Sequence, residues 1–281
     1  MIDTHAHLDF ESYDNDRAEV IRRFFEAGGK AIINIGVNGE RNKKAIDLAQ
    51  TDKKIFAVIG FHPEETTKVK LSEVVNNLEQ FLKQKIKNKI VAIGEIGLDY
   101  FYDRKNKKKQ KALFQTQLNL AQRYNLPAVI HCRDAYEDVL AILKQAKYQT
   151  LPIVMHCYMG NREQTVAFLE LSNLKFSLTG NITFNSFEKY QKGKLSEEKA
   201  EIFKTLEQIP LEKIMTETDA PFLAPNPYRG KRNESVYIQE IIKRLAEIKK
   251  LSFEEVEKIT DQNATLVRSE ERRVGKECRS R

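Results

Sequence analysis

The sequence is poor in cysteine and has no long apolar run. Three cysteines, at positions 132, 157 and 278, are spread over 281 residues. Such an odd, sparse set excludes a disulfide framework and indicates a reducing compartment. No apolar run approaches the roughly 20 residues of a membrane-spanning helix, and no basic stretch followed by an apolar one marks a signal peptide. We therefore expect a cytoplasmic protein that stays out of the membrane.

Acidic residues are outnumbered by basic ones, 40 to 47, which gives a formal net charge of +7. A positive surface suits an anionic partner such as nucleic acid, because phosphate contacts dominate that kind of affinity. Many lysine-rich proteins bind no anionic partner, so charge alone leaves the question open. The hydrophobic fraction of 41% is sufficient for a buried core.

Eight short apolar runs alternate with amphipathic segments along the chain. Nearly continuous apolarity is typical of strands buried on both faces of a parallel sheet. The alternation predicts α/β architecture in one domain over residues 1–268, a TIM-like (β/α)8 barrel, with an open doubly wound sheet as the alternative. The expected strands are residues 1–8, 31–37, 55–61, 89–96, 127–132, 152–157, 174–180 and 213–219. The expected helices are residues 14–29, 40–50, 71–86, 108–125, 134–147, 161–171, 197–208, 233–248 and 252–267.

The last residues of the chain differ from the rest. Residues 269–281, SEERRVGKECRSR, lose all apolar periodicity. We predict a charged, disordered tail there, outside the barrel domain.

Histidines are few, yet all five fall at or beside the ends of expected strands, as do two acidic residues. The C-terminal ends of barrel strands converge on one mouth, where active sites are built. A single histidine at a strand end is more often a hydrogen-bonded core residue, but that explanation does not account for all of them meeting at one rim. We therefore predict a divalent-metal site at the C-terminal mouth of the strands. The groups expected in this cleft are His5, His7, His62, Glu95, His131, His156 and Asp219.

This mixture of imidazoles and carboxylates suggests which metals would bind and what they would do. Zinc, manganese, iron, cobalt or nickel suits it better than calcium, and abundant magnesium is a further candidate. The set exceeds what one tetrahedral ion needs, so we expect two metals bridged by Glu95. A water between two metals becomes a nucleophile near neutral pH, and Asp219 is placed to accept its proton. The sequence therefore predicts a hydrolase.

Several separated motifs resemble those of the TatD family of metal-dependent deoxyribonucleases, within the amidohydrolase-like hydrolases. They run over residues 1–266 as DTHAHLD, GFHPE, GEIGLDYF, HCRDAYEDVL, MHCYMGN, SLTGNITF, TETDAPFLAPNPYRGKRNE and DQNA. The resemblance implies a 3′→5′ exonuclease that acts on single-stranded or frayed DNA with two divalent ions (zinc, manganese or magnesium). It also implies a monomer without an obligate protein partner.

The resemblance also assigns roles by position. It places His5, His7, Glu95 and Asp219 at a first metal and Glu95, His131 and His156 at a second. His62 of the GFHP motif is expected to contact phosphate. The residues expected around the cleft as substrate contacts are Asp99, Arg133, Arg229 and Asn233.

Two alternative functions remain at this point. One is an amidohydrolase that cleaves a small-molecule amide or phosphate ester. Glu95 occupies the position where many such enzymes carry a bridging modified lysine, which argues against that group only. The other is a catalytically silent nucleic-acid binder. Such a protein would have lost some of its metal-ligating residues, and none of them is lost here.

The last helix of the family closes with an apolar pair soon after Asn263-Ala264, whereas this chain continues into polar residues. The length of that helix therefore stays open.

Overall fold

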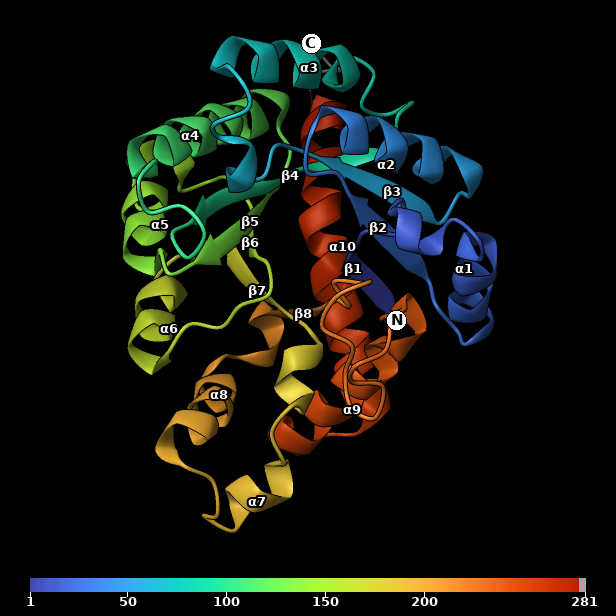
Figure 1. Cartoon of the computed structure of the whole chain (residues 1–281), viewed down its shortest axis with the longest axis vertical. Helices are drawn as coiled ribbons and strands as arrows, with labels where there is room; N and C mark the ends of the chain where they lie inside the picture. Colours follow the sequence, from blue (N-terminus) through green and yellow to red (C-terminus); the bar gives the residue numbers. More distant parts are fainter. Residues whose placement is uncertain (278–281) are drawn as a thin grey trace.

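A computed structural model describes residues 1–277, with side chains up to residue 265, and its strands form a parallel barrel. The eight strands are hydrogen-bonded in chain order from β1 to β8. A bridge between Ala6 and Ala220 brings β1 beside the end of β8 and nearly closes the ring (Figure 1). The predicted barrel is therefore confirmed. The strands are β1 Ile2–Ala6, β2 Ala31–Ile35, β3 Ile55–Ile59, β4 Ile90–Asp99, β5 Ala128–Arg133, β6 Ile153–Met155, β7 Leu174–Leu178 and β8 Ile214–Thr216.

Helices follow the strands and surround them (Figure 1). They are α1 Arg17–Glu26, α2 Gly39–Thr51, α3 Leu71–Leu82, α4 Lys107–Tyr124, α5 Tyr136–Leu143, α6 Arg162–Leu169, α7 Phe187–Gln191, α8 Glu197–Gln208, α9 Ile238–Lys249 and α10 Phe253–Glu277. Short 3-10 segments are η1 Glu11–Tyr13, η2 Pro63–Glu65, η3 Ala146–Tyr148, η4 Gly180–Thr183, η5 Leu211–Lys213 and η6 Ser235–Tyr237. The sequence did not predict α7, because five residues are too few to show a helical period.

The apolar residues divide into two clusters according to the direction in which each strand side chain points. The larger cluster fills the space between the strands and the surrounding helices. The smaller one fills the barrel and includes Val58, Val129, Val154 and Met215, with Ala264 of α10 packed against them. Alternate strand residues therefore serve the two layers, which explains why the strands are apolar on both faces.

Helix α10 holds the two strands that meet at the closure of the ring. Asp261 accepts a hydrogen bond from the backbone N–H of Ile2 in β1, at 2.7 Å. Asn263 donates to the carbonyl oxygens of Leu211 and Ile214 at 2.9 and 2.7 Å, just before and within β8. The helix thus links β1 to β8 where the strand pairing itself is slight.

The same helix continues into the tail that the sequence predicts to be disordered. Residues 269–277 form the end of α10, so this part of the prediction differs from the structure. Glutamate, arginine and lysine dominate this stretch and have high helix propensity, which an apolar-periodicity argument overlooks. Residues 278–281 lie outside the described residues. The domain boundary at residue 268 stays a prediction.

Two irregularities in strand pairing coincide with candidate ligands. The β1–β2 register shifts between Asp3 and Ala6, around His5, and the β4–β5 register shifts between Ile93 and Ile96, around Glu95. Gly97 permits this arrangement: its φ is +150°, and a Cβ there would lie 1.9 Å from the carbonyl oxygen of His131. Only glycine fits at that contact, so β4 and β5 approach closely just beside the candidate site.

Within the part of the chain that the structure describes, none of the helices is both long and apolar enough to cross a bilayer.

Candidate metal centre

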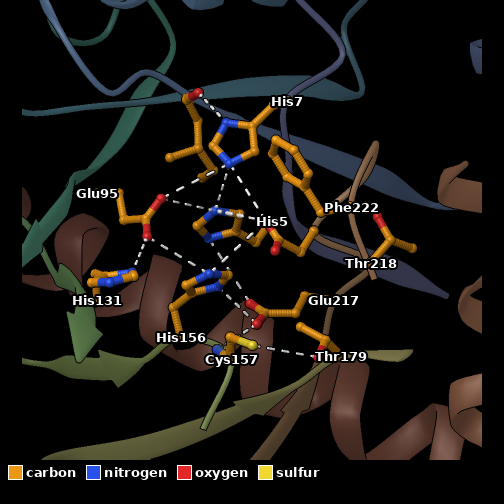
Figure 2. Close-up of polar contacts among 12 residues, drawn as sticks. His5, His7, Glu95, His131, His156, Cys157, Thr179, Glu217, Thr218 and Phe222 are labelled. Carbon is orange, nitrogen blue, oxygen red and sulfur yellow. Dashed lines mark hydrogen bonds and ion pairs between the residues drawn. The ribbon is translucent and has the colours of Figure 1, made fainter. Parts of the chain in front are cut away.

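The predicted cluster gathers at the mouth of the barrel (Figure 2). A cavity of about 920 Å³ opens there, and its floor contains imidazole and carboxylate groups. His5 lies just beneath the floor, fully buried, and stacks on the ring of His156 with 3.6 Å between ring centroids. The predicted residues that line the cavity are His7, His62, Glu95, Asp99, His131, Arg133, His156 and Asp219.

The two carboxylate oxygens of Glu95 face two different groups of histidines. Oε2 lies 3.5 Å from Nε2 of His5 and 3.9 Å from Nε2 of His7. Oε1 lies 2.8 Å from Nδ1 of His131 and 3.7 Å from Nε2 of His156. Glu95 is 5% exposed, so this carboxylate is held between the two imidazole groups with little access to solvent.

Asp219 lies on the His5 and His7 side of Glu95. Its Oδ1 is 3.8 Å from Nε2 of His5 and 3.5 Å from Nε2 of His7. The two histidine nitrogens are 3.2 Å apart. The backbone of Asp219 has φ of +57°, in the left-handed region. The turn after β8 therefore directs this carboxylate back over β1 instead of continuing the strand.

Two further carboxylates contact histidines through the ring nitrogen that points away from the centre. Oδ2 of Asp99 is 2.9 Å from Nε2 of His131. Oε1 of Glu217 is 2.8 Å from Nδ1 of His156 and accepts a hydrogen bond from the backbone N–H of Cys157 at 2.7 Å. Carboxylates in this position orient metal-binding imidazoles and raise their basicity.

Glu217 is a site residue that the sequence analysis missed. It follows β8 in the TETD motif and is 1% exposed. Its Oε2 also lies 4.0 Å from Nδ1 of His5. An acidic residue directly after an apolar strand, at the predicted mouth, was a signal equal to the one that identified Glu95. The sequence analysis instead assigned Asp219, two residues later in the same motif, to the metal site.

The charges in the cluster move the pKa values of its members. Burial lowers the pKa of His131, but hydrogen bonds to Asp99 and Glu95 outweigh it and raise the pKa to about 9. Burial also lowers the pKa of His156, but the negative charges of Glu217 and Glu95 outweigh this effect and raise the pKa to about 10. Burial raises the pKa of Glu95, but the neighbouring imidazoles hold it well below its ordinary value. The centre therefore attracts positive charge.

His62 belongs to the same cluster. Its Nε2 is 3.7 Å from Oε1 of Glu95, and its ring meets that of His131 edge to face at 4.4 Å. One nitrogen of His62, one of His131 and an oxygen of Glu95 all lie within 4.8 Å of one another. Burial, together with the positive charge of His131, lowers the pKa of His62 to about 3. A neutral imidazole at this position can bind a metal or accept a hydrogen bond.

The remaining predicted residues lie in different surroundings. Arg133 lines the cavity, whereas Arg229 stacks on Phe184 of the cavity wall, 4.0 Å from the ring centroid. Asn233 is fully buried and donates to the carbonyl oxygens of Thr218 and Phe222 at 2.8 and 2.6 Å. It does not reach the cavity, and its contacts instead hold the loop around Asp219.

The donor set fits a divalent cation. Glu95 and Asp219 are buried, and in the described part of the chain their ion-pair partners are imidazoles, with no lysine or arginine among them. Buried carboxylates without such cations are stabilised by protonated imidazoles or by a metal. Imidazole nitrogen with carboxylate oxygen is a donor mixture typical of zinc and related transition metals.

Comparisons with known proteins agree on one family. The profile described as TatD related DNase matches residues 2–268. The chain is 36% identical over 264 residues to the Bacillus subtilis protein named uncharacterized metal-dependent hydrolase YabD, covering 94% of this chain and 97% of that one. It is 30% identical over 274 residues to the 3′-5′ ssDNA/RNA exonuclease TatD of Pectobacterium parmentieri, covering 95% and 98%. The crystal structure of Escherichia coli YjjV, a TatD homologue, superposes with a TM-score of 0.84 at 27% identity, over 96% and 98% of the two chains.

Proposed function

Because this chain belongs to the TatD-related DNase family of metal-dependent hydrolases, we propose that it hydrolyses phosphodiester bonds of DNA, removing nucleotides from the 3′ ends of single-stranded or frayed strands. The relative from Pectobacterium parmentieri is named for 3′-5′ exonuclease activity on single-stranded DNA and RNA. Shared identity along almost the whole of both chains supports transfer of the reaction to this protein.

The observation that carries the proposal is the position of Glu95. One buried carboxylate presents Oε2 to His5 and His7 and Oε1 to His131 and His156. This arrangement supports two divalent cations, zinc, manganese or magnesium, with Glu95 between them. His5, His7 and Asp219 would complete the first set of ligands, and His131 and His156 the second.

Divalent cations at this centre would supply a water of lowered pKa and stabilise negative charge on the phosphate. Asp219 would accept a proton from that water. Burial raises the pKa of Asp219, but the hydrogen bond with His7 and the imidazole charges outweigh it, so the carboxylate stays ionised. His62, on the other side of Glu95, would contact a phosphate oxygen. Arg133 and Arg229 lie farther out, where they would bind the phosphates of the strand, since guanidinium binds phosphate in two-pronged fashion.

The alternative is hydrolysis of a small-molecule amide or phosphate ester at the same centre. The fold is shared with such enzymes, and the Bacillus subtilis relative is named only as a metal-dependent hydrolase. The basic residues at the cavity favour a nucleic-acid substrate over a small molecule, because Arg133 lines the cavity and Arg229 stacks on its wall.

We also propose that the protein acts in the cytoplasm as a monomer without an obligate protein partner. The sparse cysteines support a reducing compartment.

The proposal is tested by digesting 3′-labelled and 5′-labelled single-stranded DNA after chelation and after restoring magnesium, manganese or zinc. We expect metal-dependent release of mononucleotides from the 3′ end. Glu95→Gln should remove the activity, whereas Glu198→Gln, an exposed carboxylate on α8, should retain it. A protein that binds metal but cleaves no DNA under any of these conditions would refute the assignment as a DNase. Small phosphate esters and amides would then be the next substrates to assay.

A further inference from the structure

Exposed aromatic rings gather at the mouth of the metal centre. In the part of the chain that the structure describes, Phe101, Tyr102 and Phe222 are 55%, 64% and 50% exposed. Tyr102 and Phe222 line the cavity. Burying such rings normally stabilises a protein, and clustered exposed apolar surface marks a binding site.

Phe222 lies directly beside the candidate ligands. Its ring lies beside that of His7 in Figure 2, with 6.2 Å between the ring centroids. The ring of Phe10 is 6.0 Å away, and both pairs are T-shaped. Phe222 is half exposed and lines the cavity, so part of its ring remains open to a ligand there. A flat group whose attached phosphate reached the metal centre would meet this ring first.

The cations at the same mouth are held on aromatic faces. Arg133 lies 3.8 Å from the ring centroid of Phe101 and 5.0 Å from that of Tyr102. Neither Arg133 nor Arg229 forms an ion pair with any residue in the described part of the chain. Many surface arginines elsewhere do, for example Arg22 with Glu19 and Glu26. The rim therefore offers aromatic faces together with two guanidinium groups that form no ion pair with the described residues.

This combination matches one class of ligand. Unpaired nucleic acid exposes base faces along with a charged backbone, and proteins bind it through aromatic stacking beside basic residues. A duplex hides the base faces within its own stack, and a small phosphate ester needs no second aromatic platform away from the metal.

We propose that Phe222 stacks on the base of the terminal nucleotide, with the Phe101–Tyr102–Arg133 cluster receiving the adjoining part of the same unpaired strand. This inference rests on the proposed function, which it deepens by assigning the residues that select a strand with exposed bases. Phe222 then sets the preference for a free end, because a paired terminal base cannot reach its ring.

The test pairs removal of the ring with removal of the base. Binding of fluorescent oligothymidylates to the protein as purified is measured by anisotropy, using phosphorothioate linkages that resist hydrolysis. One oligomer is intact, and the others each carry a single abasic site at successive positions from the 3′ end. We expect Phe222→Ala to weaken binding of the intact oligomer about 5- to 150-fold, the range of one base–aromatic stack. On the oligomer that is abasic at the terminal position, the same substitution should have no further effect.

Controls separate stacking from folding. Phe222→Trp should restore affinity for the intact oligomer, and Ile86→Ala, which removes an 81% exposed side chain before β4, should leave all affinities unchanged. Equal weakening of every oligomer by Phe222→Ala, or no weakening of any, would overturn the proposal. Because binding is measured without cleavage, a failure of the nuclease assay and a failure of this coupling are distinguishable outcomes.

Discussion

At the scale of single residues, Glu217 shows how one carboxylate can serve two histidines that the proposed function assigns to different metals. It is 2.8 Å from Nδ1 of His156 and 4.0 Å from Nδ1 of His5, and the two rings stack against each other. The nitrogens that face Glu95 are thereby turned toward the centre. We infer that Glu217 positions ligands without itself touching substrate.

Glu217→Gln should therefore weaken metal binding about 10- to 100-fold, the usual effect of removing a partner of a metal-binding histidine. The amide keeps the shape of the side chain but removes the charge that holds His156. Metal affinity of the purified protein, measured by calorimetry after chelation, checks this. The exposed Glu198→Gln variant is the control. Unchanged affinity in Glu217→Gln would restrict Glu217 to its hydrogen bond with the backbone of Cys157.

The sequence predicted which residues gather here better than it predicted their contacts. Strand ends in a barrel share one mouth, so histidines at strand ends had to converge whatever the details of packing. The position of Asn233 could not be predicted in this way, because it lies in the long loop between β8 and η6. Its amide nitrogen donates hydrogen bonds to the carbonyl oxygens of Thr218 and Phe222. The periodicity of the sequence cannot predict such contacts.

At the scale of elements, α10 determines how the barrel closes. The strand pattern predicted all eight strands, because most of them are nearly continuous apolar runs, but it said nothing about the junction of β1 with β8. That junction depends on Asp261 and Asn263, whose partners lie more than 40 residues away in sequence. Only the folded chain reveals such long-range polar contacts.

Replacing Asn263 with alanine should lower the free energy of unfolding by about 1–3 kcal/mol, because two buried carbonyl oxygens would lose their donor. The matched control is the neighbouring exposed residue, Gln262→Ala, for which the change should stay within about 0.5 kcal/mol. Urea unfolding followed by circular dichroism measures both. Equal stability of the two variants would mean that the closure does not depend on this hydrogen-bonded contact.

At the scale of the whole molecule, the net positive charge and the positions of the individual cations predict different ways of binding a nucleic-acid strand. The net charge of +7 would attract any polyanion from any direction. Many of the surface cations, however, are neutralised by nearby carboxylates, as Arg22 is by Glu19 and Glu26 on α1. The guanidinium groups of Arg133 and Arg229 lie at the mouth and form no ion pair within the part of the chain that the structure describes. If local charge at the mouth guides the nucleic-acid strand, these two arginines should affect binding more than the net charge of the protein does.

Salt dependence separates the two explanations. For single strands, the slope of log K against log salt concentration is about −0.7 for each phosphate neutralised. We expect Arg133→Ala and Arg229→Ala each to reduce the slope for a phosphorothioate oligothymidylate by about 0.7, measured by anisotropy between about 0.05 and 0.3 M salt. Arg22→Ala removes the same charge from the molecule but should leave the slope unchanged. If all three variants lowered it equally, binding would follow the total charge of the protein, and the mouth would have no special part in guiding the strand to the metal centre.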